Sequence, residues 1–335
     1  MRISVFAYSR KGTETAKRII ALFSGDEFKA YAPERLAGDA FASDEDVYEA
    51  AFKESDAMIF VGATGIAVRK IAPYVKDKTT DPAVICVDEL AMNVIPVLSG
   101  HMGGANEIAS KLADALNSRA VITTATDINK RFSVDAWAAK RGYALGDMKT
   151  AKDISAAILE EDIPIASDFH IASGYPNGLY PCTFGKLGIL ISIYDKNPYG
   201  KTLHVVPKVV SIGIGCRKGV TKEAIRDAVD DFLAVNKISP LGIKGFASID
   251  LKKEEEGLLA YCRENGYEIK FYSADELATI EGCCSASEFV LGITGVDNVC
   301  ERAALTGADR LIESKTVYSG ITLAAAIKDT EVSFE

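Results

Sequence analysis

Short apolar runs alternate with amphipathic stretches along the first part of the chain. Residues 3–8 and 57–61 are apolar runs of strand length, and apolar positions at helical spacing follow each of them, at 13–23 and 66–74. Further elements of these two kinds are expected at 84–87, 94–98, 105–116 and 120–123. Such alternation is typical of βαβ units, so the pattern predicts an α/β fold with a mainly parallel sheet.

The rest of the chain divides into a weakly patterned part and a second α/β part. Up to about residue 207, helices are expected at 133–140 and 153–160, and strands at 187–194 and 203–206 after a loop-rich stretch. A strand at 209–213 opens the second α/β part. Its further elements are expected at 221–235, 245–249, 251–264, 268–272, 287–291 and 298–305, before a hairpin between 311 and 327.

We therefore expect three segments in a chain of 335 residues: an N-terminal α/β domain at 1–131, a linking domain at 132–207 and a separate C-terminal α/β module at 208–335. The first residues read as a strand rather than a signal peptide, and no apolar run is long enough to cross a bilayer. These features predict a cytoplasmic protein with no membrane partner.

Charge and cysteine content exclude several function classes. The net charge is −9, which argues against a nucleic-acid partner because phosphate binding draws on a positive surface. The seven cysteines are scattered without a CxxC pair, so a reducing compartment is expected, and we interpret the adjacent Cys283 and Cys284 as packing residues. His170 and His204 lack carboxylates or cysteines at ligand spacing, so no metal site is expected.

Two glycine-rich turns of the first half join a predicted strand to a predicted helix. Residues 62–69 (GATGIAVR) present backbone N–H groups to which a carboxylate or phosphate could bind, although glycine also serves any tight turn. Residues 99–106 (SGHMGGAN) place three glycines around His101, which can exchange protons near neutral pH. The alternative for His101 is that it merely caps a helix.

Other chemistry-bearing residues follow predicted strands. Asp127 comes after a strand, where ligands bind in open α/β sheets, and Asp88 and Glu89 follow another; each is a candidate for acid or base chemistry and equally for a cap. In the second α/β part, residues 213–219 (GIGCRKG) combine a turn with two cations, which favours an anion site. No turn has the spacing of a phosphate loop or a dinucleotide fold, so a nucleotide cofactor is not expected.

Together these motifs resemble the CbiG family, the cobalt-precorrin-5A hydrolases. In the first half the resemblance rests on residues 62–69, 73, 76–78, 81–84, 88–89 and 99–106. In the second half it rests on residues 213–219, 247–252, 287–290, 299–304 and 315, in a module that the family shares with a small protein of the aerobic cobalamin route.

The resemblance implies a hydrolase of the anaerobic, early-cobalt route to cobalamin. It would open the δ-lactone of cobalt-precorrin-5A and release acetaldehyde, leaving cobalt-precorrin-5B. Cobalt travels within the substrate, so no cofactor bound by the protein is expected. The partner is an anionic cobalt-tetrapyrrole, and hand-off to neighbouring enzymes of the pathway stays open.

The resemblance also implies site residues. The general base that activates water is expected to be His101, Asp88, Glu89 or Asp127, with backbone N–H groups stabilising the oxyanion. The expected substrate-binding residues are Gly62, Thr64, Gly65, Arg69, Lys76, Lys78, Ser99, Gly100, Gly103, Gly104, Asn106, Gly213, Gly215, Arg217, Lys218, Gly219 and Lys315. This hypothesis requires residues 62–69, 99–106 and 213–219 to gather around one broad cleft.

Two other functions remain alternatives. A non-catalytic carrier could hold the same tetrapyrrole intermediate through the same basic loops, and the sequence separates it poorly from an enzyme. An unrelated nucleotide-binding α/β enzyme is disfavoured by the missing phosphate-loop and dinucleotide spacings.

Overall fold

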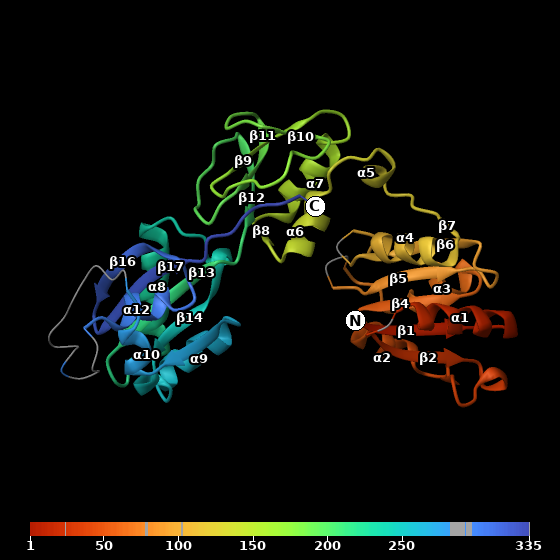
Figure 1. Cartoon of the computed structure of the whole chain (residues 1–335), viewed down its shortest axis with the longest axis horizontal. Helices are drawn as coiled ribbons and strands as arrows, with labels where there is room; N and C mark the ends of the chain where they lie inside the picture. The colour runs from red at the N-terminus through yellow and green to blue at the C-terminus, as the bar shows by residue number, and fades with distance from the viewer. Residues whose placement is uncertain (24, 78–79, 102, 282–291, 293–296, 335) are drawn as a thin grey trace. The chain divides into compact units, whose positions relative to one another are not determined.

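The computed structural model describes residues 1–23, 25–77, 80–101, 103–281, 292 and 297–334 (Figure 1). The chain forms two compact units, Met1–Lys140 and Arg141–Glu335. The second unit contains two separate sheets, and the expected segment bounds at 131 and 207 stay a prediction. None of the helices within the described ranges combines the length and the apolar content that crossing a membrane requires.

The first unit is built on one mainly parallel sheet. In sheet order, its strands in the described part are β3 (Ala42–Ser43), β2 (Glu27–Ala32), β1 (Arg2–Ala7), β4 (Ala57–Val61), β5 (Ala83–Val87), β6 (Asn93–Leu98) and β7 (Arg119–Ala120). Every neighbouring pair is parallel except β5 and β6. The α/β fold with a mainly parallel sheet is thus confirmed.

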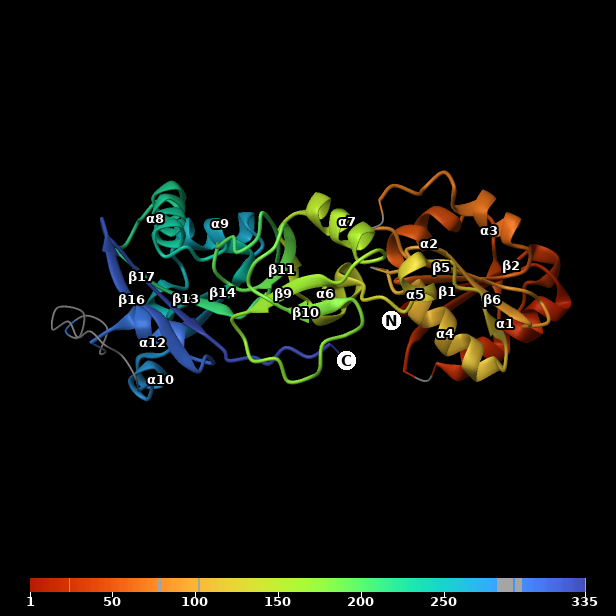
Figure 2. The same cartoon turned by 90° about the horizontal axis from the view of Figure 1, so that it is seen from above.

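Helices cover both faces of this sheet (Figure 2). The helices of this unit are α1 (Arg10–Leu22), α2 (Tyr48–Glu54), α3 (Thr64–Ile71), α4 (Ala105–Leu116), α5 (Ala125–Ile128) and α6 (Val134–Arg141). Apolar residues of α1 and α4 pack on one face in a single core, and those of α2 and α3 pack on the other face. The strands between them are buried on both sides, which explains their unbroken apolar runs.

A tight turn reverses the chain between β5 and β6. Only residues 88–92 separate the two strands, and a parallel connection needs a crossover of a dozen or more residues. The Asp88 carboxylate accepts hydrogen bonds from the N–H groups of Leu90, Met92 and Asn93, at 3.0, 3.2 and 2.6 Å. As a result β6 ends at the edge of the sheet where β4 and β5 begin.

The first sheet of the second unit corresponds to the weakly patterned part of the sequence. Its strands, in sheet order, are β10 (Leu179–Pro181), β9 (Ile163–Ser167), β11 (Leu187–Ile191), β12 (Lys201–Val206) and β8 (Ala144–Leu145), and α7 (Met148–Ala157) packs near β12. All but β8 run parallel. Strand β9 was not predicted, because Pro164 interrupts its pattern.

The last described residues return to this sheet region. The N–H of Val332 donates to the carbonyl oxygen of His170 at 2.8 Å, and the N–H of Ala172 donates to that of Val332 at 2.9 Å. The N–H of Phe334 donates to the Ser173 hydroxyl at 3.0 Å, across 161 positions of sequence. The segment after the C-terminal module is therefore held by the middle of the chain.

The C-terminal module is a second layered α/β structure. Its strands, in sheet order, are β15 (Glu268–Tyr272), β14 (Ile243–Ile249), β13 (Val210–Cys216), β17 (Ile321–Ile327) and β16 (Arg310–Tyr318). Its described helices are α8 (Lys222–Val235), α9 (Glu256–Glu264), α10 (Ala274–Ala278) and α12 (Val299–Leu305). Figure 2 shows α8 and α9 on one side of the sheet and α10 and α12 on the other.

Most elements expected in this module are confirmed, including the closing hairpin of β16 and β17 and a helix capped by Thr221. The helix expected at 251–264 is shorter, because residues 250–252 form a 3-10 turn before α9. The helix expected at 287–291 lies outside the described residues, as do Cys283 and Cys284.

Helix α12 lies directly on β13 at Gly213. A Cβ atom at this position would lie 1.8 Å from the carbonyl oxygen of Cys300 and 2.6 Å from the backbone nitrogen of Ala304. Both contacts are with backbone atoms, so no side-chain rotation relieves them. Gly213 is therefore required by helix packing.

We expect Gly213→Ala to destabilise the fold by about 2–3 kcal/mol, because an overpacked core must shift backbone. Gly174→Ala is the matched control, since a Cβ at Gly174 meets no atom within 4 Å. Urea unfolding of both variants tests this. Equal stability of the two would show that α12 does not approach β13 so closely.

Candidate functional site

The loop between β6 and α4 places His101 at the edge of the sheet where β5 begins. Ser99 follows β6 with left-handed backbone (φ 56°), and its hydroxyl donates to the carbonyl oxygen of Asp81 at 2.9 Å. The Asp81 carboxylate accepts from the N–H of Lys76 at 2.9 Å. Because Asp81 lies two residues before the buried start of β5, these bonds fix the loop at that edge.

Close packing within this loop explains its glycines. A Cβ at Gly103 would lie 2.4 Å from the Ser99 Cβ, and one at Gly100 would lie 2.8 Å from the Asn106 amide oxygen. The N–H groups of residues 104, 105 and 106 donate to the carbonyl oxygens of residues 101, 99 and 100. These three amides are therefore occupied within the loop. Substrate contacts of Ser99, Gly100, Gly103 and Gly104 stay a prediction.

His101 has hydrogen-bonding partners on both ring nitrogens. Its Nε2 lies 2.9 Å from Asp127 Oδ2 and 3.1 Å from Thr126 Oγ1. Its Nδ1 lies 3.3 Å from Ser133 Oγ and 3.8 Å from Asp135 Oδ1. The imidazole is 21% exposed, so it is held in place and still accessible.

The Asp127 carboxylate is the centre of a second set of bonds. Its Oδ2 accepts from Asn106 Nδ2 at 2.8 Å and from Thr124 Oγ1 at 2.6 Å, in addition to His101. Partial burial opposes ionisation, but hydrogen bonds from Thr124 and His101 outweigh it and hold the pKa of Asp127 below its ordinary value. Asp127 is therefore ionised at neutral pH.

The charge of Asp127 determines the tautomer of His101. A carboxylate only accepts hydrogen bonds, so the contact at Nε2 requires the proton on Nε2. In the neutral ring, Nδ1 is then the nitrogen with a free lone pair. Ser133, which also donates to the buried Asp135 at 2.7 Å, lies beside this nitrogen.

Sequence reasoning found His101, Asn106 and the segment with Thr124, Thr126 and Asp127 but missed Ser133 and Asp135. Ser133 and Asp135 lie at the start of α6, where the pattern indicated only a helix. Thr126 is buried in α5. Nothing in the spacing of these polar residues indicates that they surround one histidine.

Asp88 and Glu89 lie at the opposite edge of the sheet. Both follow β5, whose five residues rise about 17 Å, whereas Asp81 and the His101 loop are at its start. The Asp88 carboxylate is bound by turn amides, and Glu89 Oε2 accepts from the Ser9 hydroxyl at 2.5 Å. The two candidates therefore do not join the His101 cluster.

The turn at 62–69 is also at this opposite edge, because it follows β4. The thiol of the buried Cys86 donates to the carbonyl oxygen of Gly62 at 3.1 Å, and the Thr64 side chain bonds the same thiol. A Cβ at Gly65 would lie 3.7 Å from the Arg69 guanidinium, so Arg69 folds back over this turn. The turns at 62–69 and 99–106 thus do not converge. Lys78 lies outside the described residues.

The turn at 213–219 of the C-terminal module is largely satisfied by the chain itself. Gly213 is buried under α12, and its expected contact with substrate stays a prediction. The N–H of Gly219 donates to Glu255 Oε2 at 3.0 Å, and the N–H of Arg217 donates to the carbonyl oxygen of Gly320 at 2.8 Å. The turn therefore binds a carboxylate of its own chain, while the Arg217 and Lys218 side chains are exposed.

Other residues of this module that were expected to bind substrate also make contacts within the chain. A Cβ at Gly215 would lie 2.7 Å from Thr322 Oγ1, which explains this glycine by packing. The backbone N–H of Lys315 donates to the buried Glu301 carboxylate at 2.8 Å. Burial raises the pKa of the Cys216 thiol to about 11, which agrees with a packing role. Within the described ranges, no group of three or more His, Cys, Asp or Glu residues is placed to hold a metal ion.

Comparisons with known proteins show which family the chain resembles. The family models described as "Cobalamin synthesis G N-terminal" and "Cobalamin synthesis G C-terminus" match residues 46–127 and 210–326. The chain is 33% identical to a cobalt-precorrin-5A hydrolase of Priestia megaterium over 82% of this chain and 79% of that protein. It is 31% identical to a cobalt-precorrin-5A hydrolase of Salmonella typhimurium over 97% of each chain. A shorter relative, the protein CobE of a Sinorhizobium species, is 33% identical over 34% of this chain and 77% of that protein.

The two family models match one unit each, in the order in which the units occur, so the fold is that of a cobalamin-synthesis protein. With relatives above 30% identity over most of its length, this chain belongs to the CbiG family. The resemblance inferred from the motifs is confirmed.

The contacts of Asp88 predict a structural role. Partial burial opposes ionisation, but hydrogen bonds from the Met92 and Asn93 amides hold the pKa of Asp88 below its ordinary value. The stabilisation is then complete above the unfolded pKa of about 3.9 and is lost as the pH falls through the lower folded value.

We expect Asp88→Asn to reduce the free energy of unfolding by about 1–2 kcal/mol at pH 7, and the difference from wild type to shrink below about pH 4. Urea unfolding across this pH range measures it. Asp114→Asn, an exposed carboxylate on α4, is the control. A stability difference that does not change with pH would contradict this explanation.

Proposed function

We propose that this chain is a cobalt-precorrin-5A hydrolase, which opens the δ-lactone of its substrate and yields cobalt-precorrin-5B and acetaldehyde. The observation that carries the proposal is the similarity to hydrolases of this name over most of the chain. The His101 cluster supports it, because it supplies a histidine and an ionised carboxylate suited to activating water. Cobalt belongs to the substrate in this proposal, and the protein contributes no cofactor.

His101 is the proposed general base. Asp127 holds the proton on Nε2, so Nδ1 takes the proton of the attacking water, and the negative carboxylate stabilises the imidazolium that forms. The hydroxide adds to the lactone carbonyl, and the ring C–O bond then breaks. The acyl carbon becomes a carboxylate, and the meso carbon keeps the ring oxygen as an alkoxide. The alkoxide then collapses to the aldehyde as the C–C bond that joins this carbon to the macrocycle breaks, and the macrocycle keeps the electron pair and takes up a proton from the imidazolium.

Ser133 and Asp135 are proposed to orient the imidazole from its other side. Ser133 lies 3.3 Å from Nδ1, and Asp135, whose side chain is 8% exposed, accepts the Ser133 hydroxyl and the N–H of Ala136. Because the Ser133 hydroxyl donates its proton to Asp135, the lone pair of Nδ1 stays available to water on this side of the ring. Water must then bind beside Ser133 to reach this nitrogen.

We expect His101→Ala to lower kcat by at least about 10²-fold, since a general base contributes about 10² to 10⁴ in rate. Asp127→Asn should lower kcat similarly, because the ring loses the carboxylate that fixes its tautomer. Steady-state assays of aldehyde release measure both effects.

The matched control is Glu107→Gln, which removes an exposed carboxylate from the same helix as Asn106. Wild-type turnover in His101→Ala would remove His101 from the mechanism. Ser133→Ala adds a further check. If an acyl-enzyme can be trapped in wild type and is lost in Ser133→Ala, serine rather than water attacks the lactone.

The alternative function, a non-catalytic tetrapyrrole carrier, is not favoured, because the relatives that cover most of the chain are named hydrolases. Incubation of the full chain with the lactone substrate separates the two functions. We expect acetaldehyde, trapped as a hydrazone, in an amount equal to the substrate consumed. Binding without aldehyde would establish a carrier.

Finer points also belong to the proposal. Residues Gly62, Thr64, Gly65, Arg69 and Lys76 are proposed to contact the anionic substrate, and of these Lys76 lies at the His101 edge, where its N–H donates to Asp81. A cytoplasmic location and hand-off of the intermediate to neighbouring enzymes complete the proposal.

A further inference from the structure

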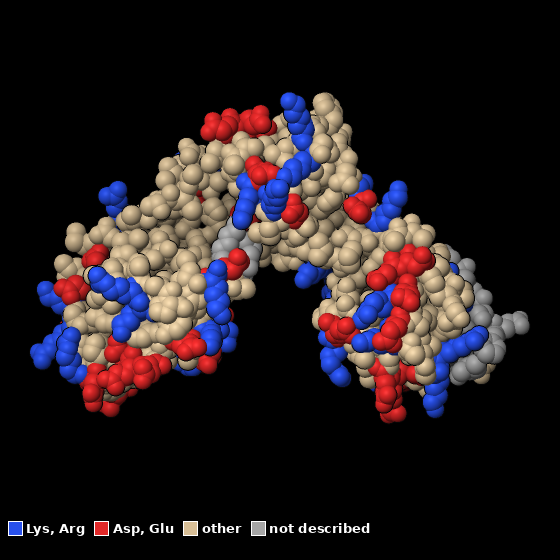
Figure 3. Space-filling model, turned by 180° about the vertical axis from the view of Figure 1, so that it is seen from behind, with Lys and Arg blue, Asp and Glu red and all other residues tan. Residues whose placement is uncertain are grey.

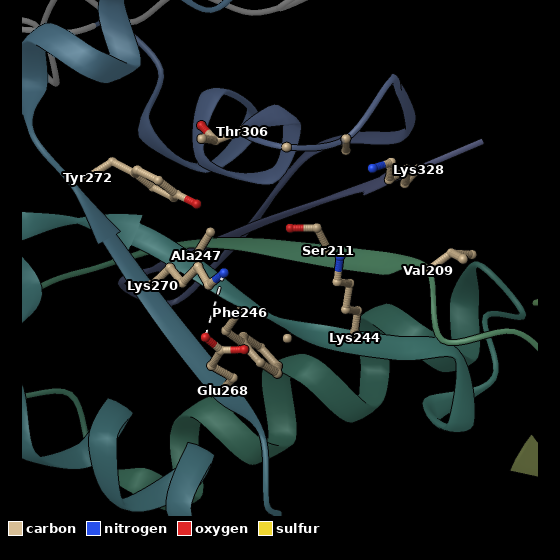
Figure 4. Close-up of a pocket in the computed structure, with 13 residues that line it drawn as sticks. Val209, Ser211, Lys244, Phe246, Ala247, Glu268, Lys270, Tyr272, Thr306 and Lys328 are labelled. Carbon is tan, nitrogen blue, oxygen red and sulfur yellow. Dashed lines mark ion pairs between the residues drawn. The ribbon is translucent and has the colours of Figure 1, made fainter. Parts of the chain in front are cut away.

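The C-terminal module has a small cavity between its sheet and the end of α12 (Figure 4). The cavity has a volume of about 130 Å³. Its polar lining residues are Ser211, Lys244, Lys270, Tyr272, Thr306 and Lys328. We call it the lysine cavity. Ser211 and Lys244 lie near the starts of β13 and β14, so the cavity is at the opposite end of these strands from the turn at 213–219.

Several donors around the lysine cavity are unused. In the described part of the chain, no hydrogen bond or ion pair is made by the side chains of Lys244 and Lys328 or by the hydroxyls of Ser211 and Tyr272. Figure 4 shows the Tyr272 and Ser211 oxygens directed into the open space from opposite sides. This contrasts with the turn at 213–219, where Glu255 already occupies the Gly219 amide.

The charge of the lysine cavity is positive in an acidic protein. Three lysines line it with a single carboxylate, Glu268, which lies 3.6 Å from Lys270. Among the residues that the structure describes, no carboxylate forms an ion pair with Lys244 or Lys328, on a chain of net charge −9. On the face drawn in Figure 3, basic and acidic side chains both occur on each unit. Ammonium and hydroxyl donors around one space are suited to carboxylate oxygens.

The volume restricts the ligand. Sites for whole drug-sized ligands occupy about 300–1,000 Å³, so a macrocycle does not fit into a cavity of this size. A short acetate or propionate arm does fit. Gly245 lines the cavity, and a Cβ there would lie 2.8 Å from the carbonyl oxygen of Glu268, so a side chain at this position has no room.

We propose that the lysine cavity binds one carboxylate arm of the tetrapyrrole and holds it through Lys244, Lys328, Ser211 and Tyr272. The inference rests on the proposed function for the identity of the ligand. It assigns the anion contact of the C-terminal module to this cavity in place of the turn at 213–219.

Binding of coproporphyrin, a tetrapyrrole with four propionate arms, to the full chain tests the proposal by fluorescence titration. Lys244→Ala/Lys328→Ala should raise Kd about tenfold, as expected for two exposed ion pairs. Tyr272→Phe should raise Kd by a smaller factor and keeps the ring that lines the cavity. Arg217→Ala/Lys218→Ala is the matched control, because it removes two cations at the other end of β13.

A larger loss of binding in the Arg217→Ala/Lys218→Ala variant than in the Lys244→Ala/Lys328→Ala variant would overturn the proposal. Succinate tests whether the lysine cavity instead binds a free dicarboxylate. If succinate binds wild type as tightly as coproporphyrin does, the cavity is a site for a free dicarboxylate and the proposal fails.

The readout is independent of lactone hydrolysis. Lysine-dependent binding in a protein that releases no acetaldehyde would leave the cavity assigned and refute the hydrolase. Aldehyde release with binding that ignores both lysines would refute the cavity and leave the hydrolase.

Discussion

The five-residue return between β5 and β6 is the constraint on which the candidate site depends. It reverses the chain, so the following loop lies where β5 begins, and Ser99 bonds the backbone of Asp81 there. Helix α4 and the segment after β7 then bring Asn106 and Asp127 to the same edge. Had this connection been a crossover, His101 would lie beside the turn at 62–69. The catalytic candidates are thus separated by strand direction more than by distance in sequence.

Much of the fold could be predicted because periodicity reports burial directly. The fully buried β4 and β5 read as unbroken apolar runs, and α8 is amphipathic with a threonine cap. The middle sheet could not be predicted in the same way. Proline within β9 removes a backbone donor, and strands of two or three residues such as β8 and β10 carry too little pattern to recognise.

The site was predictable only in part. His101 was identified by its glycine loop, and Asp127 by its place after a strand, but their contact depends on the loop geometry and on the three bonds that Asp127 accepts. The glycines of these turns were ambiguous, because a missing side chain permits either close packing or close contact with a ligand. Gly213 and Gly103 are required by close packing, and the sequence does not distinguish this role from contact with a ligand. Likewise, the backbone donors of a cationic turn can be bound by a carboxylate of the same chain, as the bond from Gly219 to Glu255 shows.

The return of residues 332–334 to the middle of the chain has a consequence for biosynthesis. During translation the region around His170 leaves the ribosome well before Val332 is made, so its bonding partners are absent while the C-terminal module is being synthesised. Pairing between segments so far apart in sequence also carries the loop-closure cost that slows folding. The backbone groups of residues 170–173 that bond residues 332–334 therefore lack these partners until the segment after β17 has emerged.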